Sequence, residues 1–350
     1  MFDQSSKSDR YQHEARLYEA GENDTVYCHL CAHNCHIQEG KFGVCRVRQN
    51  IGGKLYTLTY GRTISQHADP VEKKPLYHFY PGSGAYSFAT PGCNFHCRWC
   101  QNWEIAQLPR ETSLSLPVGD KATPEQIVSA ARRQGCRSIA YTYTEPTVFF
   151  EYAYDTAQVA RQAGLANIYV TNGFMTEAML TAFHPYLDAA NVDLKSFRDE
   201  TYKKYIGARL QPVLDSLKMM KQQGVWVEVT TLLVPGLNDS PTELRELAAF
   251  MVKELGADTP WHISRFFPNY QLTDYPPTPI ETLQRAKEIG LAEGIHYVYL
   301  GNVIGQDDSD THCPQCGRVL VRRRGFNILT NDIKEGRCPT CGTTIAGVGW

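Results

Sequence analysis

Short apolar or β-branched runs recur along the chain from about residue 86 onward, and amphipathic segments separate them. Such runs are typical of strands covered on both faces, and their alternation with helical segments predicts repeated βα units around a parallel sheet. We expect strands at residues 86–90, 138–144, 167–171, 190–194, 225–234, 261–267 and 296–300. Six strand–helix units and one further strand predict an α/β fold, a partial and open (β/α)6 barrel of the TIM-like kind.

Three of the helices have clear start signals. The segments that begin at Thr123, Ser240 and Thr278 each place a hydroxyl N-cap before proline at the first helical position, with Glu or Gln at the third. The first helix is expected to end at Gly135 and the second at Gly256, because glycine is the usual residue beyond a helix end. In parallel α/β folds the active site gathers at the carboxyl ends of the strands, so functional residues are expected there.

Cysteine is the residue type that carries the candidate chemistry. Eleven of the twelve cysteines fall into three groups, and only Cys136 stands alone, where we expect a small residue that fills the core. Because the first residues are polar and unlike a secretory signal, we expect a reducing compartment and metal ligation, not disulfides. The three groups are Cys28, Cys31, Cys35 and Cys45; Cys93, Cys97 and Cys100; and Cys313, Cys316, Cys338 and Cys341.

The central group, Cys93-x3-Cys97-x2-Cys100, directly follows the first predicted strand. A closed structural site uses four protein ligands, whereas a [4Fe–4S] cluster on three thiolates keeps one iron open for a small molecule. The spacing therefore indicates cofactor chemistry. The alternatives are a zinc knuckle and cysteines that merely fill a core.

The two outer groups predict metal-binding modules on either side of the barrel. Cys313-x2-Cys316 and Cys338-x2-Cys341, each pair followed by glycine, are typical of a zinc ribbon or a rubredoxin-like site, and we expect zinc in preference to mononuclear iron. The N-terminal group is less regular, with His29, His33 and His36 as alternative ligands, and both zinc and an auxiliary iron–sulfur cluster stay open. We expect an N-terminal metal-binding segment at 1–80, the barrel at 81–308 and the ribbon module at 309–350.

Polar residues follow several of the predicted strands. Glu145, Asn172, Asp193 and Lys195 lie at strand ends, where polar side chains are expensive to bury unless something binds them. The alternatives are a surface turn at Glu145 and an internal ion pair between Asp193 and Lys195. His262 and Arg265 are expected near the mouth of the barrel as substrate-pocket residues, although a lone histidine on a strand is often a satisfied core residue.

The segment from Thr90 to Asn102 resembles the signature of radical S-adenosylmethionine (SAM) enzymes. Together with the N-terminal cysteines, the run 141–146, the run 298–303 and the terminal ribbon, it resembles the radical enzyme of the AmmeMemoRadiSam system, which is related to pyruvate formate-lyase-activating enzyme. The resemblance implies a radical SAM barrel in which Glu145 binds the methionine amine. It also implies that Asn172, Asp193 and Lys195 contact the cofactor. Tyr143 and Thr144 stand where the radical SAM pattern has two glycines.

The resemblance implies reductive cleavage of SAM at a [4Fe–4S] cluster, giving a 5′-deoxyadenosyl radical that abstracts hydrogen from an unidentified substrate. Implied partners are Memo-like and AMMECR1-like proteins, with flavodoxin or ferredoxin as electron donor. One alternative is a glycyl-radical enzyme activase. Another, of a different class, is a non-catalytic iron–sulfur and zinc scaffold.

Charge and hydropathy exclude some partners. Lys and Arg number 35 against 37 Asp and Glu, a net charge of -2, and Arg322 to Arg324 form the one short basic run, so we do not expect nucleic acid as a partner. No apolar run approaches the roughly 18 residues of a membrane span. We therefore expect a cytoplasmic protein that does not bind membranes.

Overall fold

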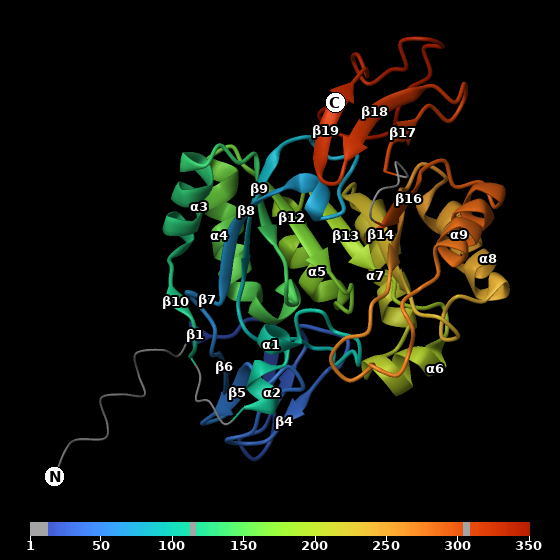
Figure 1. Cartoon of the computed structure of the whole chain (residues 1–350). Helices are drawn as coiled ribbons and strands as arrows, with labels where there is room; N and C mark the ends of the chain where they lie inside the picture. Colours follow the sequence, from blue (N-terminus) through green and yellow to red (C-terminus); the bar gives the residue numbers. More distant parts are fainter. Residues whose placement is uncertain (1–12, 113–116, 304–308) are drawn as a thin grey trace.

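The computed structural model describes residues 13–112, 117–303 and 309–350, and its centre is one eight-stranded sheet (Figure 1). Seven of the strands are parallel, as the sequence pattern predicts. They are β9 (Gly84–Ala89), β11 (Ser138–Tyr141), β12 (Ala166–Thr171), β13 (Ala189–Asp193), β14 (Trp226–Leu233), β15 (Trp261–Arg265) and β16 (Val298–Gly301). In space they follow the order of the chain.

The eighth strand, β8 (Ser65–Pro70), lies antiparallel to β9 at one edge, with Ser65 opposite Ala89. The sequence pattern does not predict it, because its residues are mostly polar and lack an apolar face. Among the described residues β8 and β16 each pair with a single neighbour, so the sheet is open and not a closed barrel. Strand β8 also precedes residue 81, and the predicted boundaries at 80 and 308 stay predictions, the latter lying outside the described residues.

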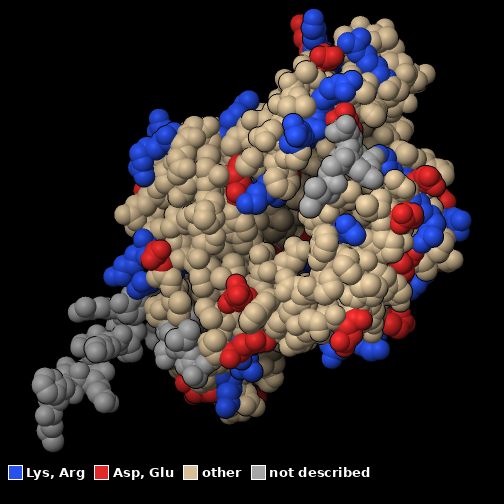
Figure 2. All heavy atoms as spheres, in the orientation of Figure 1, with Lys and Arg blue, Asp and Glu red and all other residues tan. Residues whose placement is uncertain are grey.

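Helices cover one face of this sheet (Figure 1). The longer ones are α3 (Pro124–Arg133), α4 (Phe150–Gln162), α5 (Glu177–Phe183), α7 (Gln211–Gln222), α8 (Pro241–Phe250) and α9 (Ile280–Ala292). Short segments α1 (Trp103–Ala106), α2 (Leu108–Glu111) and α6 (Asp199–Thr201) lie between strands. In the same view, Figure 2 shows a hollow near the middle of the molecule, with charged side chains of both signs around it.

Two of the three predicted helix starts are confirmed. The Thr123 hydroxyl accepts a hydrogen bond from the Gln126 amide, and the Gln126 side chain accepts one from the Thr123 amide. The Ser240 hydroxyl likewise accepts a hydrogen bond from a backbone amide in the first turn of α8. The prediction for Thr278 is wrong, because α9 begins one residue later with Pro279 as its N-cap. The Thr278 hydroxyl instead donates to the Leu233 carbonyl at 2.6 Å and so ties the loop to the end of β14.

Three small sheets contain strands from the first part of the chain, which carries the N-terminal cysteines. One contains β1 (His13–Glu14), β6 (Lys54–Thr57) and β5 (Arg48–Ile51), and another contains β2 (Tyr18–Ala20), β3 (Val26–Cys28) and β4 (His36–Ile37). The third pairs β7 (Arg62–Thr63) with β10 (Asp120–Lys121). This N-terminal module lies beside α1 and α2, on the side of the sheet where β9 ends (Figure 1).

The C-terminal module lies at the opposite end of the sheet (Figure 1). It contains β17 (Thr311–His312), β18 (Val319–Arg324) and β19 (Asn327–Asn331), and its apolar residues pack with Tyr77, Tyr297 and Tyr299. The two outer cysteine groups therefore lie at opposite ends of the sheet (Figure 1). No helix in the described ranges has both the length and the apolar character that a membrane crossing requires.

A buried ion pair joins the N-terminal module to the sheet. Both Arg48 and Glu151 of α4 are at most 1% exposed, and the guanidinium donates to the carboxylate at 2.9 and 2.7 Å. The Arg16 amide donates to the Glu151 carboxylate at 2.7 Å, and the Arg16 carbonyl accepts from the Arg48 guanidinium at 3.1 Å. Because burial of either charge alone is very unfavourable, the pair fixes how the module sits on α4.

We expect Arg48→Met to lower the free energy of unfolding by about 3 to 5 kcal/mol, because it leaves the Glu151 carboxylate buried without a partner. The matched control is Lys54→Met, which removes an exposed ion pair with Glu14 and should cost less than about 1 kcal/mol. Urea unfolding followed by circular dichroism measures both. Equal losses in the two variants would contradict the role given to the buried pair.

Candidate functional site

The cysteine loop leaves the carboxyl end of β9 and is held by backbone hydrogen bonds to a distant segment. The amides of His96 and Arg98 donate to the carbonyls of Ile206 and Tyr205, each at 3.0 Å. Gly207 has a positive φ of 77°, and a Cβ there would lie 1.9 Å from the His96 ring. The loop therefore sits against a backbone that only glycine allows.

Two aromatic side chains anchor the loop in the core. Phe95 and Trp99 are 1% and 3% exposed, and they alternate with the cysteines along the chain. The Cys93 thiol is close enough to Cys97, Cys100 and Glu145 for their charges to raise its pKa, and it lies 3.9 Å from Asn172 Nδ2 after β12. The spacing Cys93-x3-Cys97-x2-Cys100 thus combines ligands and anchors.

Burial raises the pKa of the Cys93, Cys97 and Cys100 thiols, and that of Cys97 reaches about 12. A bare thiolate is therefore unfavourable in this place, and iron would provide the positive charge that stabilises it. The Lys195 ammonium acts in the same direction, because it lowers the pKa of Cys97 and so opposes burial. The donor set fits a [4Fe–4S] cluster.

Glu145 lies beside this loop, at the end of the strand that follows β9 in the sheet. The side chain is 2% exposed, and burial raises the pKa of its carboxyl group against the effect of several hydrogen bonds. Its Oε1 accepts from Thr147 and from the Thr171 hydroxyl at 2.7 Å, while Oε2 accepts from the Asn172 amide at 2.8 Å. The carboxylate therefore ties β11 to β12, and Oε2 keeps capacity for a further donor. The predicted contact with the methionine amine stays a prediction.

Asn172 connects the end of β12 with the cysteine loop. Its Nδ2 donates to Asn94 Oδ1 at 2.7 Å and lies 3.9 Å from Cys93 Sγ, while its Oδ1 accepts from the Phe174 amide at 3.0 Å. The side chain thus lies next to Cys93, and its contact with a cofactor stays a prediction. Its hydrogen bonds order the loop from the side of β12.

Asp193 and Lys195 form an ion pair at the end of β13, with 2.8 Å between Oδ2 and Nζ. Burial acts to lower the pKa of Lys195, but the charges of Asp193 and Cys97 outweigh it, so the pKa lies above its ordinary value. The ion pair between Asp193 and Lys195 that the sequence left as an alternative is therefore present. Asp193 is still 35% exposed, which leaves its carboxylate accessible to a ligand beside the cysteine loop.

Comparison with known proteins places this arrangement in a family. The model for the Radical SAM superfamily matches residues 87–250, the range that contains the three loop cysteines and the polar strand ends. The chain belongs to the radical SAM superfamily. Members of this superfamily are enzymes.

Relatives extend the likeness over almost the whole radical SAM chain. The uncharacterized protein MJ0808 of Methanocaldococcus jannaschii is 47% identical over 334 residues, which cover 95% of this chain and 98% of that protein. The isethionate sulfite-lyase activating enzyme of Nitratidesulfovibrio vulgaris is 27% identical over 108 residues, 29% of this chain and 35% of the enzyme. A radical SAM methyltransferase from Sphaerobacter thermophilus has a similar fold, with a TM-score of 0.50, 15% identity and coverage of 69% and 71%.

The two predicted substrate-pocket residues of this radical SAM protein lie on β15, and their role in a substrate pocket stays a prediction. His262 is the second residue of β15 and 5% exposed, and its Nε2 lies 2.6 Å from Glu228 Oε2 in a cluster with Tyr77 and Tyr299. This arrangement is the satisfied core histidine that the sequence left as the alternative. Arg265 ends β15 and donates through Nε to the Thr278 carbonyl at 2.8 Å.

A second polar group, not predicted from the sequence, joins β8 to the segment that follows β11. Lys74 Nζ lies 2.6 Å from Asp69 Oδ2 and 4.6 Å from the ring centre of Tyr143, whose hydroxyl also donates to Asp69. Tyr143 has a positive φ of 64°, which explains why glycine is usual at this position of radical SAM enzymes. The tyrosine in place of glycine is the feature of the sequence that could have indicated this polar group, because it adds a large side chain near the residues predicted to bind the cofactor.

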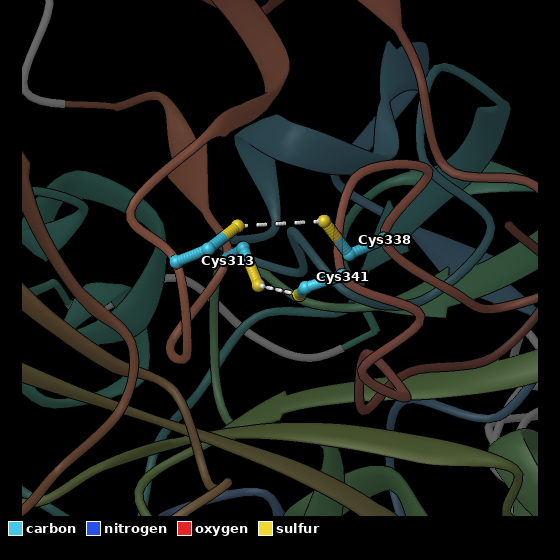
Figure 3. A group of neighbouring side chains, drawn as sticks. Cys313, Cys338 and Cys341 are labelled. Atoms are coloured by element: carbon cyan, nitrogen blue, oxygen red, sulfur yellow. Dashed lines mark hydrogen bonds between the residues drawn. The ribbon is translucent and has the colours of Figure 1, made fainter.

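The C-terminal cysteines form a compact group (Figure 3). The four sulfur atoms lie within 4.8 Å of one another, with 3.6 Å between Cys313 and Cys341 and 3.7 Å between Cys316 and Cys338. A tetrahedral zinc ion with bonds of about 2.3 Å places its thiolates about 3.8 Å apart. The geometry of this four-cysteine group is compatible with a single metal ion, and zinc stays the prediction.

We expect Cys338→Ser to lose about one bound zinc per chain and to unfold the C-terminal module at a lower temperature, since a module this small depends on its metal. Cys136→Ser is the matched control, because Cys136 is buried away from the three groups and should leave the metal content unchanged. Elemental analysis decides the matter. Unchanged zinc in Cys338→Ser would contradict the site.

Lys74 gives a prediction for pH dependence. Burial lowers its pKa to about 8, against the opposing effect of Asp69, whereas an unfolded lysine binds its proton up to about pH 10. Between these values the unfolded chain holds more protons, so the contribution of this group to stability rises with pH. Relative to Lys74→Met, the wild-type free energy of unfolding should rise by about 2 kcal/mol from pH 8 to pH 10. Parallel urea-denaturation profiles for the two proteins would contradict the lowered pKa.

Proposed function

We propose that this protein is a radical SAM enzyme that abstracts a hydrogen atom from a substrate. When bound, a [4Fe–4S] cluster and SAM supply the chemistry, by reductive cleavage to a 5′-deoxyadenosyl radical. One observation carries the proposal. The thiols of the loop after β9 lie beside polar side chains from the ends of β11, β12 and β13.

The residues of the chain would hold and orient the reacting groups. Cys93, Cys97 and Cys100 would bind three irons and leave the fourth free for the cofactor. The free capacity of Glu145 Oε2 and the exposed edge of the Asp193 carboxylate suit the ammonium and hydroxyl groups of SAM. Lys195 would hold the Asp193 carboxylate in position, since the pair is only 2.8 Å apart.

We further propose an open (β/α)6 barrel of the AmmeMemoRadiSam type, with Memo-like and AMMECR1-like proteins as partners and a flavodoxin or ferredoxin as electron donor. The motifs quoted from the sequence support this assignment. Zinc at the C-terminal four-cysteine group belongs to the same proposal.

A glycyl-radical enzyme activase is the second candidate, and the isethionate sulfite-lyase activating enzyme among the relatives favours it. An activase has to admit a segment of a large protein partner to the cofactor. The Tyr143 side chain, which reaches Asp69 of β8, fills space that a glycine at this position would leave free near Glu145. This leaves less room for a protein segment, and we therefore favour a smaller substrate.

The test is anaerobic reconstitution with iron and sulfide, reduction with dithionite, addition of SAM, and quantification of 5′-deoxyadenosine and methionine. We expect cleavage by the wild-type protein and none by Cys97→Ala. Asp193→Asn should raise the KM for SAM by roughly 10-fold or more, because a charge-assisted hydrogen bond is worth about 1.5 to 3 kcal/mol.

Asp215→Asn is the matched control for Asp193→Asn. Asp215 is an exposed carboxylate on α7, 57% accessible and paired with Lys218, so the KM for SAM should stay at the wild-type value. Cleavage retained in Cys97→Ala would refute the ligand assignment. A full cluster without cleavage in the wild type would favour the non-catalytic scaffold.

A further inference from the structure

The four N-terminal cysteines share one partly buried place at the edge of the N-terminal module. Cys28, Cys31 and Cys45 are at most 9% exposed, and Cys35 is half-buried. Gly43 lies between two of them, because a Cβ there would be 3.7 Å from Cys35 Sγ and 3.8 Å from Cys45 Sγ. The Cys28 amide also donates to the Cys35 carbonyl at 2.9 Å. Local backbone structure thus brings all four residues of the motif together.

The spacing of the thiols distinguishes this group from the C-terminal one. At the C-terminus all four sulfurs fit within 4.8 Å, as one tetrahedral ion requires. Across the described residues, which include Cys28, Cys31, Cys35 and Cys45, no other three metal-binding side chains meet that limit. The thiols of the N-terminal group, like those of the loop after β9, are therefore more widely spaced than the thiols of the C-terminal group. A [4Fe–4S] cluster needs such spacing, because each thiolate binds a different iron.

The N-terminal group also lies directly against the cysteine loop. A Cβ on Gly92 would be 2.5 Å from a methyl group of Val47 and 3.4 Å from the Cys45 carbonyl oxygen, and Gly92 has a positive φ of 104°. Glycine at this position therefore allows the backbone before Cys93 to approach the backbone of Cys45 closely. The backbones that carry Cys45 and Cys93 are therefore neighbours in the structure.

A second connection runs through Phe174. Cys31 forms a β-bridge with Met175, and the amide of the next residue, Ala32, donates to the Phe174 carbonyl at 3.4 Å. Asn94 Nδ2 donates to the same carbonyl at 3.4 Å. Short covalent and hydrogen-bonded paths therefore lead from Cys31 to Cys93, whereas the C-terminal four-cysteine group is at the opposite end of the sheet (Figure 1).

We propose that Cys28, Cys31, Cys35 and Cys45 bind a second [4Fe–4S] cluster that delivers electrons to the cluster on the loop after β9. The electron-transfer role rests on the proposed function, because that function supplies the cluster that accepts the electron. The presence of the second cluster does not depend on the proposed function. A low-potential one-electron donor such as reduced flavodoxin or ferredoxin is oxidised, and the second cluster goes from 2+ to 1+. It returns to 2+ as the loop cluster is reduced from 2+ to 1+, and that electron breaks the sulfonium bond of SAM.

Two sets of variants separate the clusters. In Cys93→Ala/Cys97→Ala/Cys100→Ala we expect about four irons, four sulfides and one zinc per chain, with an EPR signal after reduction that SAM does not change. In Cys28→Ala/Cys31→Ala we expect about four irons whose EPR signal SAM does change. Cys136→Ser, which leaves every group intact, should hold about eight irons. The C-terminal zinc and the circular dichroism spectrum report that each variant is folded.

Two zinc ions and no iron in the triple variant would overturn the second cluster. The relay is tested by the ratio of 5′-deoxyadenosine formed with reduced ferredoxin to that formed with dithionite, which should fall at least 10-fold in Cys28→Ala/Cys31→Ala. An unchanged ratio would refute the relay. If the wild type forms no 5′-deoxyadenosine, the proposed function fails and the relay with it, but the iron count still decides the cluster.

Discussion

Parallel pairing of neighbouring strands decides where every candidate ligand of the loop cluster lies. Tyr141 of β11 pairs with Phe88 on one side and with Tyr169 on the other, and Thr171 of β12 pairs with Val192 of β13. The four strands consequently end at one edge. A shift of one residue in any pair would turn alternate side chains to the helix-covered face, and the polar strand ends would no longer meet beside the cysteines.

The parts of the site that the sequence predicts are those in which local pattern and chemistry coincide. The loop cysteines, Glu145, Asn172 and Asp193 all follow apolar runs directly, and strand ends of a parallel sheet have a fixed place. The four-cysteine group at the C-terminus is equally local, because each pair of cysteines lies on one tight turn. In these cases spacing along the chain determines proximity in space.

Other features depend on packing that the sequence does not reveal. His262 follows Trp261, which packs against Gly290 of α9, so the strand pattern predicts that the His262 side chain points to the other face of the sheet. Its burial, however, depends on the hydrogen bond with Glu228, which the sequence does not reveal. Thr278 has every feature of an N-cap, yet its hydroxyl has a better use in joining β14 to the next loop. Strand β8 lacks an apolar face because it is an edge strand, and Lys74 reaches Asp69 only through the turn that follows it. Each was decided by tertiary contacts.

The seat of the cysteine loop on the backbone at residues 205 to 207 has a consequence for the order of events during synthesis. The amides of His96 and Arg98 find their acceptors only when the segment after β13 has been made and folded, although the cysteines themselves leave the ribosome much earlier. The contact of Gly207 with the His96 ring then closes this side of the loop. Iron insertion before residues 205 to 207 have been made would meet an unshaped loop, so a cluster on this loop would be assembled only after four strands of the parallel sheet, β9, β11, β12 and β13, have been made.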